Sequence, residues 1–315
     1  MVLAFALAIL TQMQLITPAQ IMFIALLNGV VMAFDAPSRQ AVVVELVGKT
    51  HLFNAIALNS VAFNSSRIIG PALAGILVAT IGMSGCFYIN GVSFLAAIIA
   101  LWTIRINRGV NENKSRGAFK DLKEGLIFIR NNRLILALIS MVGVISLFGV
   151  AHIILMPIFA NEILNVGIKG LAVLMSASGF GALIGALILA NLGDFKHKGG
   201  FLSASTILFS ISLVIFALSK TYWLSLTAMA FVGGTSVASI ALINTLLQTR
   251  TEDKFRGRVM SVFMITFAGL MPFGNLLAGS LAQVAGVSAA VMFGGLVCTG
   301  FFLVINVLYP KIRKI

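Results

Sequence analysis

The sequence places the charged side chains of Asp35, Arg39 and Arg67 inside otherwise apolar stretches. Asp35 lies near the middle of 20–46 and Arg67 near the middle of 54–82. Ionisable groups at such depth in a bilayer are costly and are functional hypotheses by default. If the two stretches are antiparallel spans, Asp35 and Arg67 could pair, and the pair could break or take up a proton during a transport cycle. Arg39, one helical turn from Asp35, competes for the same carboxylate, and a fixed structural pair is the alternative.

Uncharged or weakly basic polar groups form a second set within the apolar stretches. Some are expected to line a central cavity for a small molecule, and others to bridge helices. The candidates are Asn59, Asn64 and Asn90 in the first half, and His152, Asn244, Gln248 and Asn275 in the second. His152 could titrate near neutral pH, although a hydrogen-bonded packing role is the alternative interpretation.

Other kinds of chemistry find no support in the sequence. It contains no GxxxxGK[ST] loop for a nucleotide phosphate, no HExxH pair and no acyl-transfer constellation,. Cys86 and Cys298 lie in apolar surroundings without metal-ligand spacing,. We therefore expect no enzyme activity, no metal and no cofactor, and an ion gradient, expected to be of protons, as the energy source.

The composition indicates an integral membrane protein. Hydrophobic residues make up 59% of the 315 positions and charged residues 10%, and the mean hydropathy is +1.06. Soluble domains carry about a quarter charged residues, so lipid must be the main solvent. The net charge of +13 resides in short gaps between apolar runs rather than in a basic stripe, so we expect no nucleic-acid partner.

Apolar runs of about 20 residues predict about ten membrane-spanning helices. They cover roughly 1–15, 20–46, 54–82, 85–104, 134–160, 170–192, 200–218, 223–249, 257–284 and 288–309. Lys and Arg are concentrated in alternate gaps and in the C-terminal end, and the opposite gaps hold Lys169 and Lys220. By the positive-inside bias, both ends are expected in the cytoplasm and the chain in the inner (plasma) membrane.

One long polar segment divides the chain into three predicted parts. Residues 1–104 form a first helical half, 105–133 a cytoplasmic linker, and 134–315 a second, six-helix half. Within the linker, Phe119, Leu122, Leu126 and Ile129 recur at helical spacing, which predicts an amphipathic helix on the membrane surface. A solvated linker with chance periodicity is the alternative interpretation of this segment. For the protein as a whole, we expect a monomer.

An internal repeat relates the two halves. Residues 70–82 (GPALAGILVATIG) resemble 274–286 (GNLLAGSLAQVAG) at a shift of 274 − 70 = 204. Parallel repeated halves of this kind contain six spans each. Because about four precede the linker here, the repeat predicts roughly seventy further residues and two helices upstream.

The chain resembles exporters of the major facilitator superfamily, especially the branch of the enterobactin exporter and the macrolide efflux proteins. The motifs that carry the resemblance are 37–41 (PSRQA), 45–47 (ELV), Asn54-Ala55, 67–75 (RIIGPALAG), 90–94 (NGVSF), Gly125 and 257–261 (GRVMS). The resemblance implies an all-α polytopic membrane bundle with about ten of twelve spans present. It also implies secondary active, proton-coupled efflux by alternating access of a bulky amphipathic small molecule such as a drug, macrolide or siderophore.

The same resemblance identifies Gly70, Pro71 and Gly75 as the antiporter motif and Asp194 as part of a degenerate loop motif. Proline can kink a span, and small residues permit close packing. The sequence departs from the superfamily at Ala25, where an arginine is usual, and in the loop around Asp194. Two hypotheses therefore stay open beside export: an inactive truncated transporter and a lysophospholipid flippase of the same fold.

Overall fold

The computed structural model describes the backbone of residues 1–103, 118–150, 152–192 and 197–310. Within these ranges, the side chains of 33–34, 36–65, 67–69, 71–72, 75–76, 79, 118–123 and 253 lie outside the description. The chain divides into two units, Met1–Asn113 and Lys114–Ile315. The division falls inside the predicted linker, and the three-part organisation itself stays a prediction.

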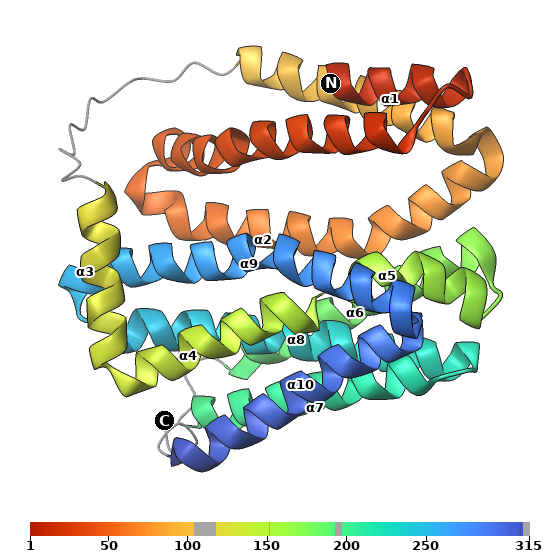
Figure 1. The fold of residues 1–315 in the computed structure, drawn as a ribbon. Coiled ribbons are helices and arrows are strands. Elements are labelled where there is room, and N and C mark those ends of the chain that lie inside the picture. The colour runs from red at the N-terminus through yellow and green to blue at the C-terminus, as the bar shows by residue number, and fades with distance from the viewer. Residues whose placement is uncertain (104–117, 151, 193–196, 311–315) are drawn as a thin grey trace. The chain divides into compact units, whose positions relative to one another are not determined.

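Two helices build the first unit, α1 (Val2–Gln12) and α2 (Pro18–Thr103). The 86 residues of α2 would extend about 130 Å as a straight helix, against about 30 Å for the hydrocarbon core. Its ribbon instead doubles back on itself (Figure 1). The sequence predicts breaks between spans at 46–54 and 82–85, but the helix continues through both. Gly82 has a φ of +75°, which glycine adopts without steric cost.

The N-terminal helix α1 packs against the last part of α2. Ala4 and Ala8 are buried, and the rings of Phe5 and Tyr88 lie 6.3 Å apart. The Tyr88 hydroxyl donates to Gln12 Oε1 at 2.7 Å, so one polar contact accompanies this apolar packing.

The second unit consists of helical elements throughout its described residues. They are α3 (Ala118–Asn131), α4 (Arg133–Val144), η1 (Ile145–Gly149), α5 (His152–Ile158), η2 (Phe159–Ile163), α6 (Gly167–Leu192), α7 (Lys198–Leu218), α8 (Tyr222–Arg250), α9 (Asp253–Ala285) and α10 (Val287–Leu308). Asn132 separates α3 from α4 because its side chain accepts hydrogen bonds from Leu134 N and Ile135 N at 3.2 and 3.3 Å. Such caps satisfy otherwise unpaired donors at a helix start.

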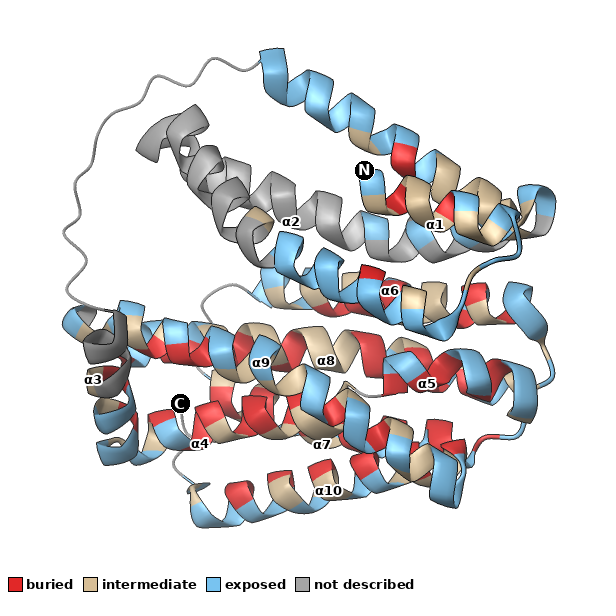
Figure 2. Cartoon of the chain, turned by 45° about the horizontal axis from the view of Figure 1, so that its top comes forward, coloured by how far each residue is buried: buried red, intermediate tan, exposed pale blue. Residues whose placement is uncertain are grey.

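The core of the second unit is apolar and lies between its long helices. Phe159 and Phe216 have ring centroids 4.4 Å apart, and Phe302 and Met229 are fully buried. On α10, buried residues run along one side of the helix and exposed ones along the other (Figure 2). Many exposed residues are large and apolar, such as Trp223 at 79%, a surface that suits lipid rather than water.

Seven helices in the described part of the chain are long and apolar enough to cross a membrane. Six of them, from Arg133–Ile163 to Val287–Leu308, match the spans predicted for the second half within a few residues, and the seventh is Thr80–Thr103. Val2–Gln12 and Pro18–Met32 are shorter apolar helices. The all-α membrane fold is thus confirmed, and the total of about ten spans stays a prediction.

Candidate functional site

The first span of the second unit is an interrupted helix. Two π-helical turns, η1 and η2, lie on either side of α5, which itself contains Pro157. A π turn adds a residue to the helical ring, and such turns are frequent at functional sites. The spacing of apolar residues in the sequence does not reveal where these π turns lie.

Neighbouring helices approach the backbone of η1 through glycines. A Cβ at Gly274 on α9 would overlap the Leu147 carbonyl oxygen, and one at Gly294 on α10 would lie 2.5 Å from the Phe148 carbonyl oxygen. Ser146, within η1, is buried and its hydroxyl has no hydrogen-bond partner. Sequence reasoning singled out Gly274 in the repeat but missed the packing role of Gly294 and the buried Ser146.

His152 lies at the junction between η1 and α5 and is 7% exposed. Its Nδ1 is 2.6 Å from the Gly149 carbonyl oxygen, and since a carbonyl can only accept, Nδ1 carries the proton and donates. The Ile153 N–H donates to Val150, three residues back. The ring of His152 thus contributes a side-chain hydrogen bond to the Gly149 carbonyl within this span.

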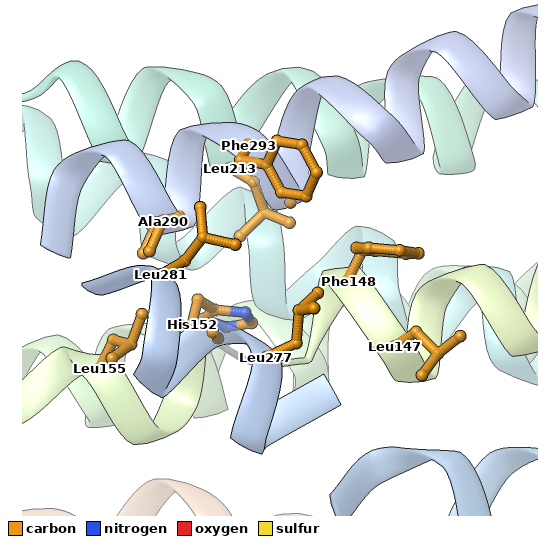
Figure 3. A pocket seen from close by; sticks show the side chains of 12 residues that line it. Leu147, Phe148, His152, Leu155, Leu213, Leu277, Leu281, Ala290 and Phe293 are labelled. Atoms are coloured by element: carbon orange, nitrogen blue, oxygen red, sulfur yellow. The ribbon is translucent and has the colours of Figure 1, made fainter. Parts of the chain in front are cut away.

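A small cavity adjoins His152 (Figure 3). Its walls come from η1, α5, α7, α9 and α10 and include Phe148, Leu213, Leu277 and Phe293. The volume of about 10 Å³ suits one water molecule at most. None of the residues lining it apart from His152 is titratable, and Asn244, Gln248 and Asn275 do not line it. This cavity is therefore too small for a bulky substrate, and the geometry favours the packing interpretation of His152.

The remaining cavity candidates of the described part lie elsewhere. On α8, Gln248 Nε2 donates to Asn244 Oδ1 at 2.6 Å, so the structure brings these two together. Arg256 Nε also donates to the Gln248 backbone oxygen at 2.9 Å. Asn275 is half-buried on α9, and Asn90 is exposed on α2.

The candidates for coupling lie in the first unit or in the loop before α7. Asp35 is half-buried on α2, and Gly70 is exposed with open space where a Cβ would stand. The other coupling candidates lie outside the residues whose surroundings are described, namely Arg39, Arg67, Pro71, Gly75 and Asp194. The same holds for two of the cavity candidates, Asn59 and Asn64. The proposed pairing of Asp35 with Arg67 stays a prediction.

A contact between the linker helix α3 and the start of α9 was not anticipated from the sequence. Arg258 Nη1 lies 2.7 Å from Glu124 Oε2, and the rings of Phe128 and Phe255 stack with centroids 4.4 Å apart. A Cβ at Gly125 would lie 3.1 Å from Arg258 Cβ, so this glycine sets how closely the helices approach. Gly125 and Arg258 both belong to the motifs that carry the resemblance.

Phe128, which the predicted apolar stripe of α3 did not include, takes part in this contact. Leu126 is 50% exposed, and the location of the stripe on a membrane surface stays a prediction. Ile129 is buried and Phe128 packs against the core. The reason is the close approach at Gly125, which turns toward α9 the face bearing residues 125, 128 and 129. Phe119 and Leu122, the other two members of the stripe, have side chains outside the described part.

Comparison with solved structures identifies a similar fold. A bacterial homologue of the human lysosomal transporter Spinster, solved inward-facing and unoccupied, superposes with a TM-score of 0.66 at 12% identity, covering 99% of this chain and 81% of that one. This likeness establishes the fold alone.

Curated relatives are more similar in sequence. The multidrug efflux pump Tap of Mycolicibacterium fortuitum is 25% identical over 93% of this chain and 73% of Tap. The staphyloferrin A transporter of Staphylococcus aureus is 24% identical, over 85% and 66% of the two chains. Macrolide efflux protein A of Streptococcus pyogenes is 23% identical, over 94% and 73%. These relatives are transporters and not enzymes, as the sequence predicted.

The family comparison extends over nearly the whole chain. The model of the transmembrane secretion effector family matches residues 1–314, which confirms the resemblance inferred from the motifs. The chain therefore belongs to the transmembrane secretion effector family, within the major facilitator superfamily of membrane transporters.

Proposed function

We propose that this protein exports a bulky amphipathic small molecule, such as a drug, macrolide or siderophore, across the bacterial plasma membrane. The observation that carries the proposal is the family match over residues 1–314, together with relatives named for drug efflux, macrolide efflux and staphyloferrin A transport. Transport would proceed by alternating access, with a substrate site between two helical halves. The protein would act as a monomer, with both termini in the cytoplasm.

The interrupted span formed by α4, η1, α5 and η2 supports a moving part in the second unit. In the π turns the regular α-helical pairing gives way to wider bonds, from Val150 N to Ile145 O at 2.9 Å and from Leu164 N to Phe159 O at 3.1 Å. The backbone of this span therefore has a second pairing available to it. Carbonyl groups of Leu147 and Phe148 lie directly against glycines of α9 and α10. A change in this span would therefore be transmitted to both neighbouring helices.

Proton coupling is a further part of the proposal. It rests on the ionisable groups placed in apolar spans, Asp35 and Arg67 in the first unit,. A proton taken up by Asp35 would weaken its attraction to a neighbouring cation and so favour one conformation over another.

Vesicle transport tests the function directly. Inside-out membrane vesicles containing the full chain, energised with a pH gradient, are expected to accumulate a fluorescent macrolide or a ferric-siderophore analogue faster than vesicles lacking it. Asp35→Asn is expected to abolish the response to the pH gradient while the folded yield stays unchanged. Exchange of substrate without a gradient is expected to persist in this variant.

Three outcomes separate the competing hypotheses. Absence of uptake for every substrate would contradict export and favour an inactive transporter. Movement of labelled lysophospholipid between leaflets without drug uptake would favour a flippase. Full pH-driven uptake by Asp35→Asn would contradict the role of this carboxyl in coupling while leaving export intact.

A further inference from the structure

An apolar groove runs along α8 between α6 and α7. It has a volume of about 440 Å³. Phe180 and Ile184 of α6, Leu208 of α7 and Phe231 of α8 line it, and these four side chains are 42–56% exposed. All of the lining residues belong to the second unit.

The floor of the groove is made by two helices in backbone contact. A Cβ at Gly181 or Gly185 on α6 would overlap the carbonyl oxygen of Ala230 or Gly234 on α8. Glycines permit this approach, which side chains would block. The floor is thus smooth and rigid, and it is bounded by the larger side chains of Phe180 and Phe231.

The lining offers almost nothing to a polar ligand. Its side-chain polar atoms are the hydroxyls of Ser205 and Thr235. Ser205 donates to the Leu202 carbonyl at 3.0 Å, and Thr235 donates to the Phe231 carbonyl at 2.5 Å. An occupant with polar groups in the groove would leave them unpaired, which is unfavourable. The groove therefore suits a hydrocarbon chain.

One end of the groove lies close to positive charge. Phe201, in the lining, follows Lys198 by three residues at the start of α7, a distance of about 4.5 Å along the helix axis. His197 is exposed beside it, and the connecting sequence 193–199 (GDFKHKG) has two lysines against one aspartate. Along 170–192 and 222–249 the sequence contains no Asp, Glu, Lys, Arg or His.

We propose that this groove binds one acyl chain of a membrane phospholipid whose anionic head group lies beside His197 and Lys198. The bilayer supplies such molecules to any apolar groove on a membrane helix. Basic residues at the membrane surface select anionic lipids. All of its lining lies in the second unit, and lipid binding there can be tested without any transport measurement.

Tryptophan quenching by brominated phospholipid tests the proposal. The full chain with Trp102→Phe and Trp223→Phe provides a background free of other tryptophans, and both native rings are 79% or more exposed. Ile184→Trp reports from the groove, and Leu303→Trp on α10, 48% exposed, reports from the ordinary lipid boundary. The proteins are reconstituted in phosphatidylcholine with increasing brominated phosphatidylglycerol.

We expect Ile184→Trp to be half-quenched at a phosphatidylglycerol fraction about fivefold lower than Leu303→Trp, the selectivity expected of one basic residue at an anionic surface. Adding Lys198→Gln should remove that selectivity. Adding Ala204→Phe, which fills the groove from α7, should remove the difference between the two reporters.

Equal quenching of both reporters would overturn the proposal, because the groove would then be ordinary lipid boundary. Weak quenching of Ile184→Trp at every lipid fraction would also overturn it, because protein would then cover the groove. If the reporters do not fold, native mass spectrometry of the unmodified chain decides. The site is supported if phosphatidylglycerol stays bound to the protein while phosphatidylcholine is lost. Equal loss of both lipids contradicts it.

Discussion

His152 illustrates how a polar side chain in an apolar span can serve structure. Its Nδ1 donates to Gly149 in a cavity with room for a single water at most,. A buried carbonyl left without a donor costs about 1–3 kcal/mol. The ring therefore stabilises the junction between η1 and α5, and any part it takes in proton transfer would be additional to this bond.

Two substitutions separate these roles. His152→Leu removes the donor and should lower the free energy of unfolding by about 1–3 kcal/mol. His152→Asn keeps an N–H near Gly149 but cannot gain a proton, so it should retain stability. Thermal unfolding in detergent measures the first effect, and vesicle uptake at several pH values measures the second. If His152→Asn is as stable as the parent yet loses pH-dependent uptake, a purely structural role is contradicted.

Glycines at the contact between α6 and α8 act by lacking a side chain, because this lets the two backbones touch. Gly185→Ala would force its Cβ against the Gly234 carbonyl, and overpacking of this kind costs about 1–3 kcal/mol. Gly300→Ala on α10 is the matched control because nothing lies within 4 Å of its Cβ position. We expect a lower melting temperature for the first variant and an unchanged or higher one for the second. Equal stability of the two would contradict backbone contact.

At the scale of the helices, the contact between α3 and α9 combines an ion pair with aromatic packing. The Glu124–Arg258 pair is partly exposed, with side-chain exposures of 39% and 18%, and exposed ion pairs contribute about 0–1 kcal/mol. The stacked rings of Phe128 and Phe255 and the close approach at Gly125 therefore provide most of the docking. These contacts fix α3 to the start of α9 within the second unit.

Hydrogen exchange can rank these contributions. Gly125→Val should displace α3 and raise amide exchange over residues 126–131 about tenfold or more, whereas Glu124→Gln should raise it only a few-fold, in keeping with the weakness of exposed ion pairs. Gly257→Ala on α9 is the control, since nothing lies within 4 Å of its Cβ position. A larger effect of Glu124→Gln than of Gly125→Val would show that charge rather than packing holds the helix.

Across the whole molecule, the positions of charge and of apolar length define how the chain crosses the membrane. The loop containing Lys220 joins α7 to α8, and Lys254 lies at the start of α9 beyond the far end of α8. One membrane crossing separates the two sites. The excess of Lys and Arg near 250–258 predicts that this end is cytoplasmic.

Cysteine labelling checks this orientation. In a background with Cys86→Ala and Cys298→Ala, Lys220→Cys should react with a membrane-impermeant maleimide on intact cells. Lys254→Cys should react only after the cells are opened, because the bilayer then no longer excludes the reagent. Both lysines are exposed, so poor access within the folded chain does not confuse the result. The reverse pattern would invert the predicted topology.

The amino-acid sequence was sufficient for the membrane setting and for the spans of the second unit, because each depends on local apolar length and charge. It was also sufficient for the family, because the motifs are contiguous. The π turns, the bond from His152 to Gly149 and the face of α3 that meets α9 depended on the tertiary structure. These features arise where glycines such as Gly125, Gly274 and Gly294 meet helices distant in sequence, and residue periodicity within one helix carries no information on which neighbour it will touch.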